Sequence, residues 1–311
     1  MSEIKTVFIV GPTASGKTSL SIELAKKYNG EIISADSMQI YKDIHIASAA
    51  PSHEEMSGIN HHLLEFLETD FQFSVADYVK LARKKIIEVN KRGKLPIIVG
   101  GTGLYINALL DNTEFIESDT DYDLRISLEA KFDSLGGEKM LQLLSEFDPD
   151  TANRLHPNNR RRIIRAFEVY SLTGKTISEQ NILSHNNKSF MKPIVFGITY
   201  DDRQKLYDRI NTRVDLMLDN GLLDEAKIAY SRNTNKGGFQ AIGHKELFGY
   251  IDGALSLNEA IENLKQQTRR YAKRQLTWFR RDQRINWVFP DINPDYLSDI
   301  CSKLNKFLKE E

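Results

Sequence analysis

The sequence has little of several features that mark particular protein classes. Its 311 residues include one cysteine, Cys301. A single thiol excludes internal disulfides and any zinc site built on cysteines, which agrees with a reducing compartment. No run approaches the roughly 20 consecutive apolar residues of a membrane-spanning helix. No apolar signal-peptide core precedes the first predicted strand, so we expect a cytoplasmic protein without a membrane partner.

The net charge is also small, at −1, but the charged residues are strongly segregated. Residues 111–150 contain twelve Asp or Glu and three Lys or Arg, whereas residues 265–284 contain eight Lys or Arg and one Asp. Local charge, and not the average, therefore indicates the partners. With 41% hydrophobic and 27% charged residues, the chain suits one sizeable α/β core and a smaller appendage.

A phosphate-binding motif occupies residues 11–18, with the sequence GPTASGKT. In the pattern G-x-x-x-x-G-K-[ST], backbone N–H groups surround phosphate oxygens, a lysine adds positive charge and a hydroxyl ligates Mg²⁺. An apolar run at residues 6–10 predicts a preceding strand, and residues 19–28 have helical spacing. This order predicts a P-loop NTPase-like parallel sheet core that binds a nucleotide such as ATP or another diphosphate. The predicted phosphate ligands are Gly11, Pro12, Thr13, Ala14, Ser15, Gly16, Lys17 and Thr18, and Thr18 is also the predicted magnesium ligand.

Two further strands are predicted to end beside this motif. Residues 31–35 are followed by Asp36, and residues 95–99 are followed by a glycine-rich turn that contains Thr102. The carboxyl ends of parallel strands line a common crevice, so we expect Lys17, Asp36 and Thr102 to lie close together. An Asp-Ser pair at a strand end also suits a helix cap or a solvated turn, and a Gly-Gly-Thr sequence suits an ordinary turn. The phosphate site nearby favours the catalytic interpretation.

A metal site at the adjacent His61 and His62 is a second possibility raised by the sequence. Neighbouring side chains of a strand point to opposite faces, and no cluster of Cys or Asp lies near in sequence. We therefore interpret the two histidines as structural. A long amphipathic helix is predicted to follow, with Ser74 as its N-cap, Asp77 completing a capping box, and its end at Gly93.

The middle of the chain reads as an inserted all-helical domain. The acidic region at residues 111–123 resembles a domain boundary, and no strand pattern follows it until residues 194–198. We expect residues 1–117 and 190–311 to form the α/β core and residues 118–189 the insert. Helices are predicted at residues 124–135, 138–146, 160–172, 202–220, 222–230, 257–281 and 295–311, a polar linker at 184–189 and a late strand at 287–289.

Two of these helices are strongly basic. Arg161 and Arg165 lie four residues apart at a helix N-terminus, where the helix dipole opposes positive charge, and this hints at an anionic partner. Residues 266, 269, 270, 273 and 277 lie along one side of the later helix, which would focus charge for a polyphosphate backbone. In both helices a solvated charged face is the alternative.

The motifs taken together resemble those of the bacterial tRNA dimethylallyltransferases, the tRNA isopentenyltransferase family. The resemblance covers nearly the whole chain and rests on GPTASGKT at 11–18, DSMQIY at 36–41, GGTGLY at 100–105, HPN at 156–158, RAFEV at 165–169 and QLTWFR at 275–280. It implies a transferase that moves a dimethylallyl group from dimethylallyl diphosphate to the exocyclic N6 amine of the adenine 3′ of the anticodon. Mg²⁺ is the implied cofactor, the tRNA anticodon stem-loop the implied partner, and a monomer the expected state.

The resemblance also implies roles for single residues. Asp36 would be the general base, Thr102 would place the reacting amine, and Arg213 would pair with the diphosphate. The implied tRNA contacts are Asp36, Ser37, Met38, Gln39, Thr102, Arg125, Arg161, Arg162, Ile163, Ile164 and Arg165. The chain departs from the family at Ala50, where a lysine is common, and at His244, where a tyrosine is usual. The first departure questions a lysine-mediated contact, and the second questions the packing or base contact of its turn.

Three other functions fit parts of the sequence. A small-molecule kinase or ATPase would use the phosphate motif alone and turn over ATP without tRNA, but no apolar strand other than the one before Asp36 ends in a second acidic Mg²⁺ ligand. An enzyme that prenylates free adenine nucleotides would leave the basic helices without a purpose. An RNA-binding switch would bind RNA in a nucleotide-dependent way and modify no base.

Overall fold

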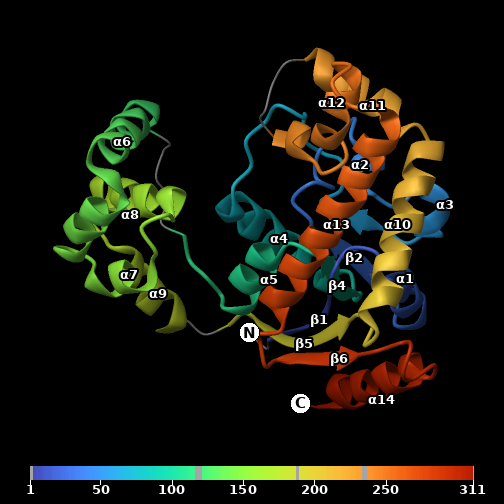
Figure 1. The fold of residues 1–311 in the computed structure, drawn as a ribbon. Helices are drawn as coiled ribbons and strands as arrows, with labels where there is room; N and C mark the ends of the chain where they lie inside the picture. The colour runs from blue at the N-terminus through green and yellow to red at the C-terminus, as the bar shows by residue number, and fades with distance from the viewer. Residues whose placement is uncertain (1–2, 116–120, 187–188, 233–236, 311) are drawn as a thin grey trace. The chain divides into compact units, whose positions relative to one another are not determined.

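The computed structural model describes residues 3–115, 121–186, 189–232 and 237–310 (Figure 1). The chain divides into two compact units, which we describe separately. Unit 1 contains residues 1–109 and 190–311, and unit 2 contains residues 110–189. The boundary expected at residues 117 and 118 falls on a segment outside the described residues. The assignment of residues 118–189 as a tRNA-binding domain stays a prediction.

Unit 1 is built on a six-stranded sheet with the strand order β3-β2-β4-β1-β5-β6, and all of its strand pairs are parallel. The central strand β1 pairs on one side with β4 and on the other with β5, the strand that returns from unit 2. It is fully buried from Val7 to Val10, as expected for a parallel sheet covered on both faces. The strands are β1 (Ile4–Val10), β2 (Gly30–Ser34), β3 (His61–His62), β4 (Leu95–Gly100), β5 (Met191–Ile198) and β6 (Ile285–Val288). The predicted α/β core is confirmed.

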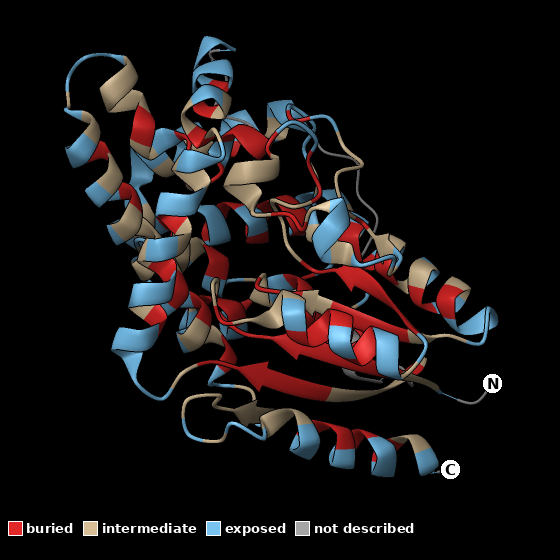
Figure 2. Ribbon diagram, turned by 90° about the vertical axis from the view of Figure 1, so that its right-hand side faces the viewer, coloured by how far each residue is buried: buried red, intermediate tan, exposed pale blue. Residues whose placement is uncertain are grey.

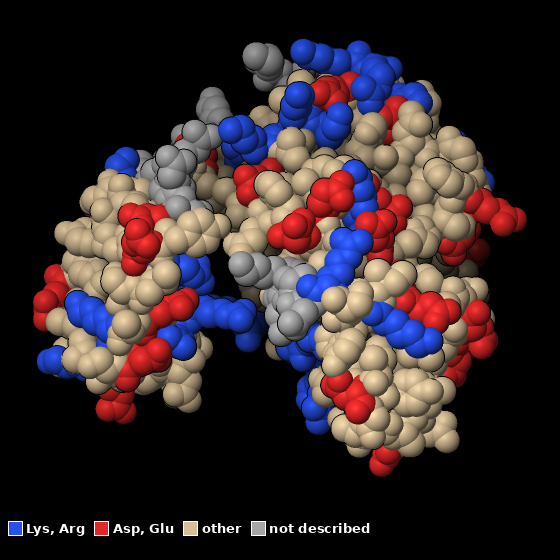
Figure 3. Space-filling view, turned by 90° about the horizontal axis from the view of Figure 1, so that it is seen from above, with Lys and Arg blue, Asp and Glu red and all other residues tan. Residues whose placement is uncertain are grey.

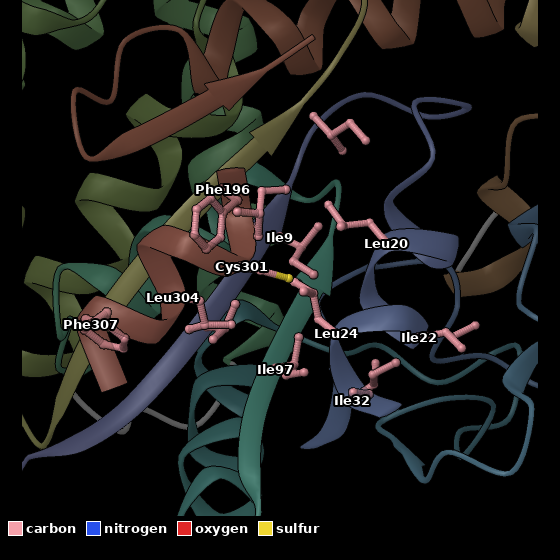
Figure 4. Packing of buried hydrophobic residues seen from close by; sticks show 14 residues of the cluster. Ile9, Leu20, Ile22, Leu24, Ile32, Ile97, Phe196, Cys301, Leu304 and Phe307 are labelled. Carbon is pink, nitrogen blue, oxygen red and sulfur yellow. The ribbon is translucent and has the colours of Figure 1, made fainter. Parts of the chain in front are cut away.

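Helices cover both faces of this sheet. On one face, Val7 and Ile9 pack with Leu24 of α1 and with Leu304 and Phe307 of α14 (Figure 4). The alternate strand residues point to the opposite face, where α4 packs against β1, β2 and β4. Figure 2 shows that burial is concentrated on the strands and on the sheet-facing sides of the helices. The helices of unit 1 are α1 (Lys17–Lys27), α2 (His45–Ser48), α3 (His53–Met56), α4 (Val75–Lys91), α5 (Gly103–Leu110), α10 (Arg203–Asp219), α11 (Leu222–Ser231), η1 (Gly237–Gln240), α12 (Lys245–Ile251), α13 (Leu257–Phe279) and α14 (Tyr296–Lys309).

The two adjacent histidines have separate structural partners. They form the short strand β3, where His62 Nε2 lies 2.6 Å from Glu31 Oε2 and His61 Nδ1 lies 2.9 Å from the Ile59 carbonyl oxygen. No group of three or more His, Cys, Asp or Glu that could hold a metal ion occurs among the described residues. Among these described residues, no helix is long and apolar enough to cross a membrane. The capping box of α4 at Ser74 and Asp77 is confirmed.

The described residues of unit 2 contain helices and no strand. Helix α6 (Tyr122–Ser145) is broken at Gly136, whose φ of 77° and ψ of 163° are not helical, so the two helices predicted here are confirmed. Helices α7 (Pro149–Arg154), α8 (Arg160–Thr173) and α9 (Ile177–Asn186) complete the unit. A polar linker was predicted to begin at residue 184. This prediction is wrong for residues 184–186, because α9 continues to Asn186. Helix α7 was not predicted, although Asp148 caps it and Pro149 occupies its first turn.

Candidate active site

The loops after β1, β2 and β4 meet at one edge of the sheet. These strands are neighbours in the order β2-β4-β1, so Asp36 after β2 and Thr102 after β4 lie on the phosphate-loop side of the sheet edge. The backbone N–H of Thr102 donates to the Ala35 carbonyl oxygen at 3.2 Å. A Cβ at Gly100 would lie 2.1 Å from the same carbonyl oxygen, so only glycine allows this close approach. The predicted convergence of separate strand ends is therefore present.

Asp36 and Thr102 are joined through the turn that follows β2. The Ser37 N–H donates to Thr102 Oγ1 at 2.9 Å, and the Met38 N–H donates to Asp36 Oδ1 at 2.9 Å. One carboxylate oxygen of Asp36 therefore stabilises the turn, as the sequence had allowed. Its second oxygen accepts no hydrogen bond from the part of the chain that the structure describes, and the residue is half-buried. Asp36 therefore has a fixed orientation and one oxygen available to a ligand.

The phosphate loop has the backbone geometry that its sequence predicted. Gly16 and Ala14 have left-handed φ values of 100° and 62°, and Lys17 Nζ donates to the Pro12 carbonyl oxygen at 2.6 Å. A Cβ at Gly11 would lie 2.3 Å from the Ile198 carbonyl oxygen of β5. Ser15 is 1% exposed, and its hydroxyl has no hydrogen-bond partner among the described residues. A buried, unpartnered hydroxyl in this loop is suited to a polar ligand.

Two arginines of α10 reach the same loop. Arg213 Nη1 donates to Thr13 Oγ1 at 3.2 Å, and Arg209 Nε donates to the Ala14 carbonyl oxygen at 2.9 Å. The family resemblance implied a role for Arg213, whereas Arg209 was not predicted. Their placement brings a helix from the last third of the chain against a loop from its beginning.

Lys17, Arg213 and Asp36 form one electrostatic group. Burial lowers the pKa of Lys17 to about 7, an effect that Arg213 strengthens and the Asp36 carboxylate opposes. Burial also lowers the pKa of Arg213, again opposed by Asp36. Two partly desolvated cations share one carboxylate here, so the site lacks negative charge. A bound anion such as a diphosphate would supply it.

Three tyrosines lie close enough to Asp36 for its charge to affect them. The rings of Tyr78 and Tyr105 stack with their centroids 4.1 Å apart, and Tyr78 is fully buried with no partner for its hydroxyl among the described residues. Burial raises the pKa of Tyr78, Tyr105 and Tyr271, and the nearby Asp36 carboxylate adds to each shift. These side chains are therefore neutral phenols near Asp36. This aromatic environment was not predicted from the sequence.

Gln275 of α13 is a structural part of the site that was not predicted from the sequence. Its Oε1 accepts from the Thr13 N–H at 2.8 Å, and its Nε2 donates to the Gly101 carbonyl oxygen at 2.9 Å. It thereby links the phosphate loop to the loop that carries Thr102. One signal was present in the sequence: Gln275 lies on the buried face of α13 with Ala272 and Phe279. A polar residue at such a position needs buried partners.

The Gln275→Leu variant is expected to lose about 1–3 kcal/mol of unfolding free energy, because the Thr13 N–H and the Gly101 carbonyl lose their side-chain partner. Chemical denaturation of the ligand-free protein measures this loss. Gln266→Leu is the matched control, because Gln266 is exposed on the same helix. Equal stability of the two variants would contradict the bridging role of Gln275.

The other predicted contacts of unit 1 lie near Asp36 or on α13. Gln39 accepts from Ser34 Oγ at 3.0 Å, and Ser37 and Met38 form the turn already described. On α13, Lys265 and Arg269 bind α10 residues, at 2.8 Å from Asp215 and 2.6 Å from Asn211. The predicted stripe of charge is therefore only partly exposed. Its exposed basic residues are Arg270, Lys273, Arg274, Arg280 and Arg281.

The residues of unit 2 that were predicted to contact tRNA include both exposed and buried side chains. The side chains of Arg161, Arg162 and Arg165 are exposed, but those of Ile163 and Ile164 are 0% and 3% exposed and belong to the helical core. The structure gives the two isoleucines a packing role, so we restrict the predicted tRNA contact to the arginines. Arg125 and Arg165 both lie 3.4 Å from the buried carboxylate of Glu168. Lys and Arg lie among Asp and Glu over the face shown in Figure 3. The net charge of the chain therefore does not describe the charge of any one part of this surface.

Comparison with known proteins gives consistent matches. Residues 39–282 match the family described as IPP transferase. A tRNA dimethylallyltransferase from Acetivibrio thermocellus is 50% identical over 287 residues, covering 91% of each chain. The enzyme of that name from Bacillus subtilis is 48% identical and covers 93% of this chain and 91% of its own.

Solved structures extend this similarity to the fold. A tRNA isopentenylpyrophosphate transferase from Bacillus halodurans superimposes with a TM-score of 0.73 at 43% identity, covering 99% of this chain and 97% of its own. A eukaryotic dimethylallyltransferase acting on tRNA gives a TM-score of 0.82 at 30% identity, covering 99% and 82%. The chain belongs to the IPP transferase family.

Proposed function

We propose that the protein transfers a dimethylallyl group from dimethylallyl diphosphate to the exocyclic N6 amine of the adenine 3′ of the anticodon in tRNA. The products are N6-isopentenyladenosine in the tRNA and diphosphate. The observation that carries the proposal is the pairing of the Asp36 turn with Thr102 beside the Lys17 and Arg213 cations. Names of relatives that cover nine-tenths of the chain support the same reaction. A tRNA substrate would place the reaction in the cytoplasm.

The diphosphate is held by the phosphate loop, Lys17 and Arg213. The backbone N–H groups of the loop and the two cations supply positive potential at the position where the leaving group gains negative charge. Mg²⁺ fits this donor set, because the Thr18 hydroxyl opens α1 and the Ser15 hydroxyl is buried and unpartnered among the described residues. When bound, the ion would supply further stabilisation of the departing diphosphate.

Asp36 acts as the general base. An adenine amine is a weak nucleophile because its lone pair is delocalised into the ring, so removal of its proton assists attack. As the new C–N bond forms and the C–O bond to diphosphate breaks, the amine proton passes to the available oxygen of Asp36. In this proposal the Thr102 hydroxyl, which accepts from the Ser37 N–H, positions the amine.

The tyrosines around Asp36 exclude water from the reacting carbon. Positive charge develops on the allylic carbon as the diphosphate leaves, and water would capture it. The stacked rings of Tyr78 and Tyr105 offer an apolar environment, and aromatic faces interact favourably with cations.

tRNA binds through exposed arginines and lysines. Single-stranded RNA loops are recognised by splayed bases, and enzymes that modify a base extrude it from its stack. We assign the backbone contacts to Arg161 and Arg162 of unit 2 and to the exposed basic residues of α13.

Charge reversal at Arg161 and Arg162 together is expected to weaken tRNA binding about tenfold and to reduce the slope of log affinity against log salt by roughly 2. The physical reason is that each phosphate contact releases condensed counterions. Filter binding over a range of salt concentrations measures both quantities. Reversal of Lys139 and Lys175, exposed on the same unit, is the control with an equal charge change. An unchanged slope in the arginine variant would remove α8 from the interface.

One experiment tests the reaction itself. Purified protein is mixed with Mg²⁺, unmodified tRNA and dimethylallyl diphosphate, and digested nucleosides are examined by mass spectrometry. We expect adenosine at the position 3′ of the anticodon to gain one dimethylallyl group. ATP turnover without tRNA would favour a kinase or ATPase, and transfer to free AMP at a comparable rate would favour a nucleotide prenyltransferase. Nucleotide-dependent tRNA binding without a modified base would favour an RNA-binding switch.

A further inference from the structure

The carbonyl group of Ala49 is a direct partner of the predicted diphosphate arginine. Arg213 Nη2 donates to Ala49 O at 3.3 Å, and Gln39 Nε2 donates to the same oxygen at 3.1 Å. Ala49 ends α2 in the left-handed conformation, with φ 50° and ψ 45°, which is unfavourable for a residue with a Cβ. The surrounding structure must therefore hold this short segment in place.

Glu225 of α11 supplies that restraint. Its Oε2 accepts from the Ile46 N–H and its Oε1 from the Ala47 N–H, both at 2.9 Å. These are N–H groups of the first turn of α2, which has no side-chain cap of its own. A carboxylate from a distant helix thus caps the segment that presents Ala49 O to Arg213.

His244 fixes the orientation of this carboxylate. The His244 ring is fully buried, and its Nε2 lies 2.8 Å from Glu225 Oε1. Its Nδ1 has no partner among the described residues. Since a carboxylate only accepts hydrogen bonds, we assign the proton of this hydrogen bond to Nε2. Glu225 then accepts three N–H groups, and His244 has a defined role at the position where the family usually has a tyrosine.

Packing holds the same parts together. Ile46 and Ala47 pack against a cluster that includes Leu222 and Ala226 of α11. Gly243, with φ +119°, precedes His244, and a Cβ there would lie 3.5 Å from that of Ala47. The α2 segment is therefore seated directly on the elements that carry Glu225 and His244.

We propose that Glu225, oriented by His244, is a positioning residue for diphosphate binding. It acts through α2, because α2 places Ala49 O, and Ala49 O together with Thr13 Oγ1 fixes the two ends of the Arg213 guanidinium. Loss of the Glu225 cap releases one of these two acceptors and leaves Arg213 less well oriented toward the phosphate loop. The inference rests on the proposed role of Arg213 in diphosphate binding.

The first test is calorimetric titration of the full chain with inorganic diphosphate and Mg²⁺. Glu225→Gln places an amide group against the N–H donors of α2, so we expect affinity to fall about tenfold. Asp224→Asn is the matched control, because Asp224 lies exposed on the same helix and, among the described residues, forms an ion pair with Lys227 alone. In steady-state assays the KM for dimethylallyl diphosphate should rise and kcat should fall, because Arg213 also stabilises the departing diphosphate, while tRNA affinity stays within about twofold of the wild type.

A double-mutant cycle separates positioning from general stability. If Glu225 acts through Arg213, Glu225→Gln should weaken diphosphate binding far less in an Arg213→Met background than in the wild type. A variant that loses thermal stability but binds diphosphate normally would overturn the inference. A wild-type protein that does not bind diphosphate would instead contradict the proposed function.

Replacement of His244 gives a second line of evidence. His244→Leu removes the third donor to Glu225 and should also weaken diphosphate binding. His244→Gln retains an N–H donor near the same position and should recover most of the affinity. Equal affinities in these two variants would refute the orienting role of His244, even if both are less stable than the wild type.

Discussion

The Asp36→Asn variant is expected to transfer dimethylallyl groups about 10²- to 10⁴-fold more slowly than the wild type. Asparagine keeps an oxygen that can accept from the Met38 N–H, so the turn after β2 should persist. It cannot take up the amine proton as the C–N bond forms. Single-turnover assays with saturating tRNA and dimethylallyl diphosphate isolate the chemical step from binding and release.

Binding measurements decide whether Asp36 acts in chemistry or in recognition. We expect the tRNA dissociation constant of Asp36→Asn to stay within about threefold of the wild type, since a general base contributes mainly in the transition state. Asp77→Asn is a suitable comparison, because Asp77 completes the capping box of α4 and accepts from the Ser74 N–H at the start of that helix. A large loss of tRNA binding with substantial remaining turnover would assign Asp36 to recognition and not to proton transfer.

The sheet could be predicted from the sequence because buried parallel strands are short apolar runs bounded by turns. The five predicted strands, at residues 6–10, 31–35, 95–99, 194–198 and 287–289, begin and end within three residues of β1, β2, β4, β5 and β6. Strand β3 was missed, because a two-residue strand of histidines has no apolar pattern and forms only by pairing with Ile32 and Ile33. Helix α7 was missed for a related reason, since six residues are too few to show helical periodicity.

From the sequence, only the site residues that follow from strand order or from a recognised motif could be predicted. Loops that follow parallel strands share an edge, and this rule brought Asp36 and Thr102 to the phosphate loop. Gln275, Tyr78 and Glu225 lie on helices whose docking depends on packing between distant segments. Nothing in the local sequence specifies that Gln275 contacts Thr13, 262 positions earlier.

The Lys17→Met variant is expected to reduce dimethylallyl transfer by about 10²- to 10³-fold, the range found when one preorganised electrostatic group is removed. In the proposed reaction Lys17 stabilises the departing diphosphate, and methionine keeps much of its length without the charge. The KM for dimethylallyl diphosphate should also rise, because the lysine attracts the ground-state diphosphate. A variant with nearly wild-type kcat and KM would contradict the placement of diphosphate beside Lys17.

Proton uptake gives an independent check on the same lysine. Burial lowers its pKa from 10.5 to about 7, so at pH 8.5 the ligand-free lysine is mostly neutral. A bound diphosphate favours the charged form, so binding at pH 8.5 should take up nearly one proton at Lys17, whereas binding at pH 6 should take up none there. Calorimetry in buffers of different ionisation enthalpy measures this uptake. Lys17→Arg, which stays charged throughout, should lack the Lys17 contribution.

The lowered pKa of Lys17 also predicts a stability cost in the ligand-free protein. The unfolded chain holds the lysine proton up to about pH 10.5 and the folded chain only up to about pH 7, so between these values wild-type stability gains from rising pH. Lys17→Met is therefore expected to exceed the wild type in unfolding free energy by about 1–3 kcal/mol below pH 7, with the difference vanishing near pH 10.5. Urea denaturation at several pH values tests this. A lysine that lowers the unfolding free energy of the ligand-free protein but accelerates the reaction is retained for binding a ligand. A Lys17→Met variant that is less stable than the wild type at pH 6 would contradict that conclusion.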